Sequence, residues 1–151
     1  MAHHLTSCTA TIFAIFLLKS TVDTAETSKL RITRQPNGPE LSSPLVVGAR
    51  QTLNIYCAAV NTDSPGTVRG LHWRFPNNSR VPEVNIARVR DLNKYDVGMV
   101  VYLDNNMWIG LLRMNRTQLS LAGIYTCVAN FSGMPKSRSM ELQVSGGCRL
   151  K

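Results

Sequence analysis

Few side chains in this chain of 151 residues could carry out chemistry. It holds four cysteines and three histidines, and His72 is the one histidine beyond the first ten residues. A catalytic nucleophile needs a base positioned beside it, and the sequence shows no such triad and no paired carboxylates. It also shows no cluster with metal-ligand spacing and no glycine-rich phosphate loop. We therefore predict a protein that is not an enzyme and that binds no metal and no cofactor.

Four residues stand in a recognisable order. Cys57 ends an alternating apolar stretch at positions 53, 55 and 57, and Trp73 is the centre of another at 71, 73 and 75. Tyr125 precedes Cys127 by two positions in the run Gly-Ile-Tyr-Thr-Cys-Val-Ala. This order of cysteine, tryptophan, tyrosine and cysteine is the signature of one kind of β-sandwich. From roughly residue 30 to residue 144 the chain resembles the immunoglobulin superfamily, as a single domain of variable or intermediate type.

The resemblance implies an all-β fold, in which two antiparallel sheets form a sandwich. It implies one inter-sheet disulfide between Cys57 and Cys127, with Trp73 packed against the sulfurs and Tyr125 turning a corner. Such a bridge would close a loop of 70 residues, for which the chain-entropy model gives roughly 4 kcal/mol. The chain departs from the family at Leu121, where members usually carry an aspartate.

Alternating residues between turn signals predict a series of short strands. The turn residues 35–39 split the first strand, so that its halves can join different sheets. The stretches at 84–89 and 99–103 are the additional middle strands of the longer variable or intermediate type. The expected strands cover residues 29–33, 45–47, 52–58, 71–75, 84–89, 99–103, 108–114, 123–129 and 137–144.

The first residues predict secretion. The apolar run at 9–18 has about the length of a signal-peptide core and is too short to span a bilayer. We expect a signal peptide at 1–25, an immunoglobulin-like domain at 26–144 and a flexible tail at 145–151. An uncleaved membrane anchor is the alternative reading of the leader.

Three Asn-x-Ser/Thr acceptors fit a secretory route. They begin at Asn77, Asn115 and Asn130. Asn77 follows a predicted strand beside turn-forming prolines, and Asn130 opens a loop between two strands. Asn115 lies at the end of a predicted strand, and its exposure is harder to predict.

Cys148 has no expected partner inside the domain. A leftover cysteine in an oxidising compartment indicates an intermolecular bridge or a capped thiol. Because Gly146 and Gly147 make the tail flexible, Cys148 could join two copies as a disulfide-linked homodimer. The alternative is that the chain is a fragment or splice form of a longer protein and ends in this tail.

The formal net charge is +8, which bears on the kind of partner the protein binds and not on its fold. Outside the cell a basic patch would bind polyanions such as sulfated glycans, whereas nucleic acid is excluded by compartment. The alternative is a solvated surface that keeps the domain soluble. The candidate patch consists of Arg69, Arg74, Arg80, Arg88, Arg90 and Lys94.

A second candidate surface follows from strand alternation. In variable-type domains one sheet is a common interaction face, and its outward residues here would include Arg74, Ile124, Thr126 and Val128. Apolar residues beside an arginine are typical of protein interfaces. We therefore predict a secreted, glycosylated module that binds an extracellular or cell-surface protein. The alternative is a polyanion-binding protein that uses the basic patch.

Overall fold

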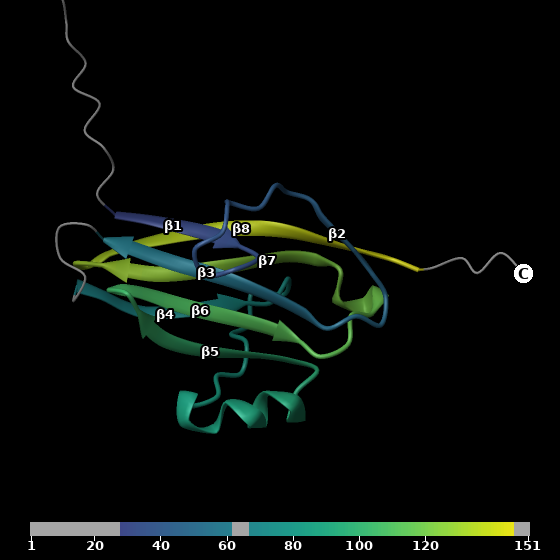
Figure 1. The fold of residues 1–151 in the computed structure, drawn as a ribbon. Helices are drawn as coiled ribbons and strands as arrows, with labels where there is room; N and C mark the ends of the chain where they lie inside the picture. Colours follow the sequence, from purple (N-terminus) through teal and green to yellow (C-terminus); the bar gives the residue numbers. More distant parts are fainter. Residues whose placement is uncertain (1–27, 62–66, 147–151) are drawn as a thin grey trace, which may run out of the picture.

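The computed structural model describes residues 28–61 and 67–146. Two four-stranded sheets pack face to face (Figure 1), with strand orders β1-β3-β6-β5 and β2-β8-β7-β4. The predicted all-β sandwich is confirmed. The predicted leader at 1–25, Cys148 and most of the tail at 145–151 lie outside the described residues.

The strands pair antiparallel except for β2 and β8, which run parallel. In chain order the elements are β1 Ser28–Thr33, β2 Leu45–Gly48, β3 Leu53–Asn61, β4 Val68–Arg74, the 3-10 helix η2 Ile86–Lys94, β5 Val97–Asp104, β6 Met107–Met114, the 3-10 helix η3 Leu119–Leu121, β7 Gly123–Phe131 and β8 Met134–Ser145. The predicted split of the first strand is correct, because β1 joins β3 in one sheet and β2 joins β8 in the other.

Alternation along the strands explains where the core lies. In β7 every second residue from Tyr125 to Phe131 is buried, and the intervening residues face outward. A strand presents alternate side chains to opposite faces, so one face of each sheet supplies the apolar layer between the sheets. β8 behaves in the same way at Met140, Leu142 and Val144.

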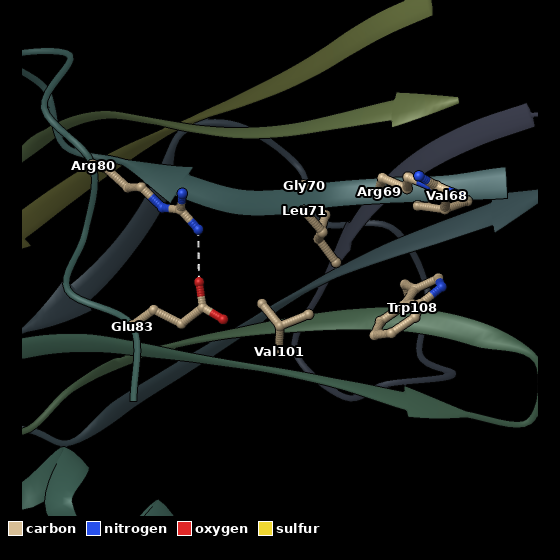
Figure 2. A pocket seen from close by; sticks show the side chains of 8 residues that line it. All are labelled: Val68, Arg69, Gly70, Leu71, Arg80, Glu83, Val101 and Trp108. Atoms are coloured by element: carbon tan, nitrogen blue, oxygen red, sulfur yellow. Dashed lines mark hydrogen bonds and ion pairs between the residues drawn. The ribbon is translucent and has the colours of Figure 1, made fainter. Parts of the chain in front are cut away.

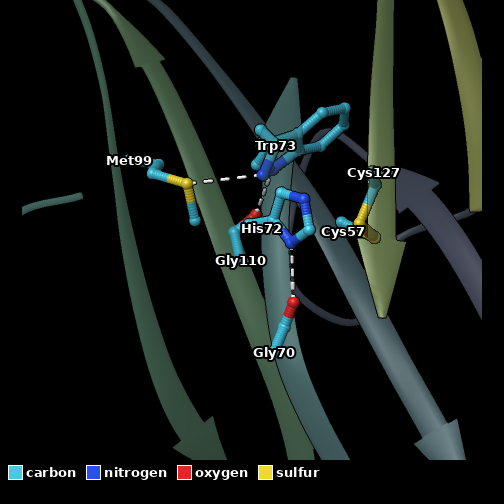
Figure 3. Close-up of a disulfide and its surroundings, with 7 residues drawn as sticks. All are labelled: Cys57, Gly70, His72, Trp73, Met99, Gly110 and Cys127. Carbon is cyan, nitrogen blue, oxygen red and sulfur yellow. Dashed lines mark hydrogen bonds between the residues drawn. A yellow bond between two sulfur atoms is a disulfide. The ribbon is translucent and has the colours of Figure 1, made fainter. Parts of the chain in front are cut away.

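The disulfide lies at the centre of this layer. Cys57 on β3 is bonded to Cys127 on β7, with their Cα atoms 6.4 Å apart, so the bond joins the two sheets. Trp73 is fully buried beside it (Figure 3) and donates its indole N–H to the carbonyl oxygen of Gly110 at 2.8 Å. The backbone N–H of Trp73 also lies 3.3 Å from the sulfur of Met99. The one polar atom of this large side chain is therefore satisfied inside the core.

Tyr125 fixes the corner before β7. Its hydroxyl donates to the carbonyl oxygen of Leu121 at 2.9 Å, and burial raises the pKa of Tyr125 to about 12. Gly123 starts the strand with φ +141°, and a Cβ atom there would lie 2.7 Å from Cγ of Pro76. Only glycine fits this approach, which explains the glycine two positions before the tyrosine. Leu121, in place of the usual aspartate, packs against the core.

One of the two predicted middle strands is wrong. Residues 84–89 do not form a strand, because Asn85 accepts the backbone N–H of Ala87 and starts the 3-10 helix η2. Ile86 and Val89 are 49% and 43% exposed, so their hydrophobicity does not report a buried strand. An asparagine side chain that bonds the backbone two residues ahead offers the chain a turn in place of a sheet ladder. The other expected middle strand, at 99–103, is present within β5.

Helix η2 packs beside β5 (Figure 1) and covers part of the outer face of the β1-β3-β6-β5 sheet. Its Leu92 is buried with Val84 and Val100 in a second, smaller apolar cluster. Among the described residues, no helix has the length and apolar character needed to span a membrane.

Candidate binding surfaces

The outward side chains of β4, β7 and β8 form one exposed surface, which we call the open face. In this surface Ile124 is 55% exposed, although it stands on a regular, well-paired strand. Thr126 and Val128 follow it on β7 and are partly exposed, while their neighbours Tyr125 and Cys127 are buried. The open face consists of His72, Arg74, Ile124, Thr126, Val128, Ser137, Ser139 and Glu141.

Strand register arranges these side chains in rows across the sheet. Arg74, Thr126 and Ser139 form one row, with the two hydroxyl oxygens 2.9 Å apart. Residues directly opposite each other on neighbouring strands are close enough to interact. The next row joins His72, Val128 and Ser137. The face therefore alternates apolar side chains with short polar ones, and Arg74 stands at its edge.

The arrangement around His72 leaves its ring without a free nitrogen. Nδ1 lies 2.7 Å from the carbonyl oxygen of Gly70 (Figure 3), and Nε2 accepts the Nε–H of Arg74 at 3.2 Å. This pattern requires the tautomer that carries its proton on Nδ1. Arg74 in turn donates to Asn78 at 3.0 Å. His72 thus positions the arginine, and no general base is left pointing to solvent from this ring.

A second surface lies between the two sheets, where the edge strand β4 faces the edge strand β5. Here the side chains enclose a hollow of about 280 Å³, which we call the edge groove. In Figure 2 an apolar floor separates the ion pair of Arg80 and Glu83, 2.6 Å apart, from Trp108 at the other end. The residues that line the edge groove are Val68, Arg69, Gly70, Leu71, Arg80, Glu83, Val101 and Trp108.

The edge groove exists because residues 80–84 close only part of the gap between the sheets. The N–H of Val81 bonds the carbonyl of Trp73 on β4, at 2.9 Å. The chain then crosses to β5, where Met99 donates to Pro82 and accepts from Val84, both at 2.8 Å. Beyond these bonds the two strands continue without a covering segment among the described residues, and the hollow opens there.

The structure does not gather the predicted basic patch into one surface. Arg69 and Arg80 line the edge groove, and Arg74 belongs to the open face. The remaining three, Arg88, Arg90 and Lys94, stand on η2. Glu83 pairs with Arg80, and Asp91 pairs with Lys94 at 2.8 Å. The hydrogen bond and charge of Asp91 raise the pKa of Lys94. In the part of the chain that the structure describes, no group of three or more potential ligands could hold a metal ion.

The three glycosylation acceptors have different surroundings. Asn77 is exposed in the turn after β4, where its side-chain oxygen accepts the N–H of Ser79 at 3.0 Å and the hydroxyl of Ser79 at 2.6 Å. Asn130 is partly exposed at the turn between β7 and β8, where its oxygen accepts the N–H of Gly133.

The Asn115 amide is engaged in the fold. Its Nδ2 donates to the carbonyl oxygens of Leu92 at 2.9 Å and Tyr95 at 2.6 Å, and its oxygen accepts from Arg113. Thr117 of the same acceptor is fully buried. Its hydroxyl bridges the backbone between β2 and β3, bonding the carbonyl of Gly48 and the N–H of Gln51.

The edge groove is the feature that sequence reasoning missed. Its cue was present, because Gly70 adopts φ +63° at a bulge between Arg69 and His72. A glycine inside a strand pattern often marks such a bulge. Recognising the groove also required knowing that residues 80–84 cross between the sheets, and that crossing depends on tertiary contacts.

Comparison with known proteins identifies the fold. No protein-family model and no curated protein matches the chain. A crystal structure of the Dscam1 Ig7 domain, isoform 5, matches with a TM-score of 0.50 and 11% identity over 78% of this chain and 96% of that one. The N-terminal eight Ig domains of Down Syndrome Cell Adhesion Molecule match with a TM-score of 0.54 and 15% identity, over 80% of this chain. The twitchin kinase region from C. elegans matches with a TM-score of 0.50 and 18% identity, also over 80%.

The last two matches cover 15% and 17% of their longer chains. At such identities the likeness concerns the fold alone. Together with the two sheets and the bridging disulfide, it shows that the described residues form a single immunoglobulin-like domain.

Proposed function

We propose that this protein is a secreted, glycosylated recognition module that binds an extracellular or cell-surface protein through the open face. The observation that carries the proposal is the 55% exposure of Ile124, which lies near the start of β7 at one end of the open face and pairs with Glu141 of β8. Val128 and the hydroxyls of Thr126 and Ser139 extend this surface along and across the strands. Apolar side chains among hydrogen-bonding groups, beside an arginine, match the composition of protein interfaces.

The environment of the open face supports this role. Ile124 is 55% exposed, whereas η2 covers part of the opposite outer face. A single exposed apolar residue is ordinary on a protein surface. The rows around Ile124 make it part of a continuous, firmly paired platform, and a rigid platform limits the entropy lost on binding.

Secretion and glycosylation belong to the same proposal. The disulfide between the sheets forms and persists in an oxidising compartment, as expected of a secreted domain. We assign glycans to Asn77, in the turn after β4, and to Asn130, near the end of β7, which lie at opposite ends of the sandwich. Ile124 and Asn130 are six residues apart on β7, about 20 Å at the usual rise per residue. A glycan on Asn130 would therefore lie far from Ile124, whereas Asn77 follows Pro76, which lies against Gly123 at the Ile124 end of the open face.

Asn115 is excluded from this assignment by its chemistry. A glycan replaces one hydrogen of Nδ2, and both hydrogens of Asn115 are used by the carbonyls of Leu92 and Tyr95. Glycan attachment there would remove one of these two hydrogen bonds at the end of η2. Peptide mapping of the secreted protein is expected to find sugar at positions 77 and 130 and an unmodified Asn115.

Binding of sulfated glycans through the basic residues is the alternative function. It needs converging charges, and the six candidates are distributed over the edge groove, the open face and η2. Two of the six are also paired with carboxylates. We therefore rank protein recognition above polyanion binding.

A cell-binding assay separates the two functions. The secreted protein, tetramerised to raise avidity, is applied to a panel of cells with and without enzymatic removal of sulfated glycans. We expect binding that survives glycan removal and 0.5 M salt, and that is lost in Ile124→Asp. The matched control is Val89→Asp, which places the same charge at an exposed apolar residue of η2. Binding that vanishes with the glycans and persists in Ile124→Asp would replace the proposal by the polyanion alternative.

A further inference from the structure

The edge of β5 carries backbone groups that no described segment covers. On the free edge of β5, the N–H of Met99 donates to the carbonyl of Pro82, and the carbonyl of Met99 accepts the N–H of Val84. Backbone groups in a strand alternate in direction with a period of two, so Val101 and Leu103 direct theirs to the same side. Among the described residues, no hydrogen bond extends the ladder past Met99 on that side. The edge of β5 is therefore open from Val101 to Leu103.

The side chains next to this edge form an apolar surface. Leu71 and Val101 make the floor of the edge groove, and Trp108 makes its end (Figure 2). Leu103 is 55% exposed and lies opposite Trp108 in the register of β5 and β6. An open strand edge beside exposed apolar side chains is the arrangement that natural proteins usually protect or use.

Arg69 supplies the charge of this surface. It is exposed on β4 at the rim of the edge groove, and its side chain makes no ion pair or hydrogen bond within the described part of the chain. The other arginine of the groove, Arg80, is neutralised by Glu83 at 2.6 Å. A ligand that enters the groove therefore meets one uncompensated positive charge, in a chain whose formal net charge is +8.

We propose that the β5 edge and the edge groove form a docking site for an extended peptide segment of a partner protein. The peptide pairs with the backbone of Val101 and Leu103 as an added strand. It places an apolar side chain against Leu71 and Trp108 and a carboxylate against Arg69. This site is separate from the open face, and it goes beyond the proposed function because it adds a second, independent contact surface.

The shape and chemistry of the groove favour a peptide over a small molecule. Its volume of about 280 Å³ is at the lower limit of the roughly 300–1,000 Å³ of sites that enclose small ligands. That space suits side chains of a bound strand, while main-chain hydrogen bonds to the edge supply affinity, as in other cases of strand addition. The existing chain shows the mode of binding, since residues 82–84 pair with Met99 on the same edge.

Selection from a displayed library of random linear peptides tests the charge of the bound peptide and its location beside Arg69. The full-length secreted protein is the bait, and we expect the enriched peptides to combine acidic with bulky apolar residues. Arg69→Glu is expected to weaken a selected peptide by about tenfold or more, because it replaces a charge-assisted contact with repulsion. Arg88→Glu is the matched control, since it makes the same charge change at an exposed site on η2, and it should bind as the parent does.

Backbone methylation of the selected peptide tests strand pairing with the protein unaltered. N-methyl groups at alternate positions remove the donors that face β5, and we expect about a tenfold or larger loss of affinity in that set. The same number of N-methyl groups at the intervening positions should leave affinity nearly unchanged. Equal effects of both sets, or binding that is indifferent to Arg69→Glu, would overturn the proposal. It would also be overturned if sedimentation showed that the edge is instead occupied by a second copy of the chain.

Discussion

The two outer faces of the sandwich differ although both belong to four-stranded sheets of the same fold. On the β1-β3-β6-β5 side, η2 packs on β5, and Leu92, Val84 and Val100 form a buried cluster. On the open face, Ile124 is 55% exposed. Apolar residues on one face thus contribute to folding, whereas those on the other are free to contact a partner.

This difference shows that outward apolar residues cannot be interpreted from strand alternation alone. Val100 and Ile124 both stand at outward positions of regular strands, yet Val100 is 1% exposed. The helix η2 covers Val100, and the side chain of Asn115 donates to the carbonyls of Leu92 and Tyr95 at the end of this helix. An outward apolar residue is therefore buried or exposed according to which other segment of the chain packs on it.

Both faces depend on the bond between the sheets, so its removal should have the largest effect. Cys57→Ala opens a bridge that closes a 70-residue loop, and we expect a loss of about 2–5 kcal/mol in the free energy of unfolding, with poor secretion. Urea denaturation of the purified protein measures the loss. Cys148→Ser serves as the control because Cys148 takes no part in this bridge. Equal stability of Cys57→Ala and the parent would contradict the role assigned to the bridge.

The next effect concerns pH. Tyr125 has a pKa of about 12, raised by burial from its ordinary value of 10. The stabilisation that this shift represents is fully present below about pH 10 and is lost as the pH rises through 12, because the unfolded chain ionises first. The loss is expected to be on the order of 2 kcal/mol. Urea unfolding between pH 8 and 12 should show it.

Two tyrosine variants check the assignment of this pH effect. Tyr125→Phe should reduce the alkaline loss to the smaller part expected from Tyr102, whose pKa burial also raises, while costing about 1 kcal/mol at neutral pH through the lost bond to Leu121. Tyr95→Phe changes a tyrosine that is 41% exposed and should retain the alkaline loss. An alkaline loss as large in Tyr125→Phe as in the parent would assign the effect to another group.

Substitution of Asn115 should weaken the packing of η2 on β5. Asn115→Ala removes the donor to two carbonyls and should cost about 1–3 kcal/mol. Hydrogen exchange should accelerate at residues 86–96 more than elsewhere. Asn93→Ala is the matched control, because Asn93 is an exposed asparagine of the same helix. If both variants exchange alike, Asn115 does not hold η2 in place.

The sequence predicted the centre of this domain better than its edges. The core positions of β3, β4 and β7 follow from two-residue alternation, and the disulfide follows from the resemblance that those positions support. The stretch 84–89 does not form the predicted strand, because its apolar residues Ile86 and Val89 are exposed and a side-chain cap at Asn85 starts η2. The edge groove could not be predicted, since it depends on where residues 80–84 leave β4 and join β5.

The smallest expected effect on stability is at Val128, and it gives the sharpest test of the open face. Val128 lies between the buried residues Cys127 and Ala129, so its side chain points away from the core and lies opposite His72 and Ser137. Because surface changes usually alter stability by about 0.5 kcal/mol or less, Val128→Asp should melt nearly as the parent does. Its binding to cells should nevertheless fall, since the carboxylate would be desolvated in the interface.

Ala129→Asp is the contrasting variant, because that neighbour is 1% exposed and its carboxylate would be buried in the core. Parallel loss of folding and binding in Val128→Asp would show that residue 128 belongs to the core, and the open face would then lose its central residue.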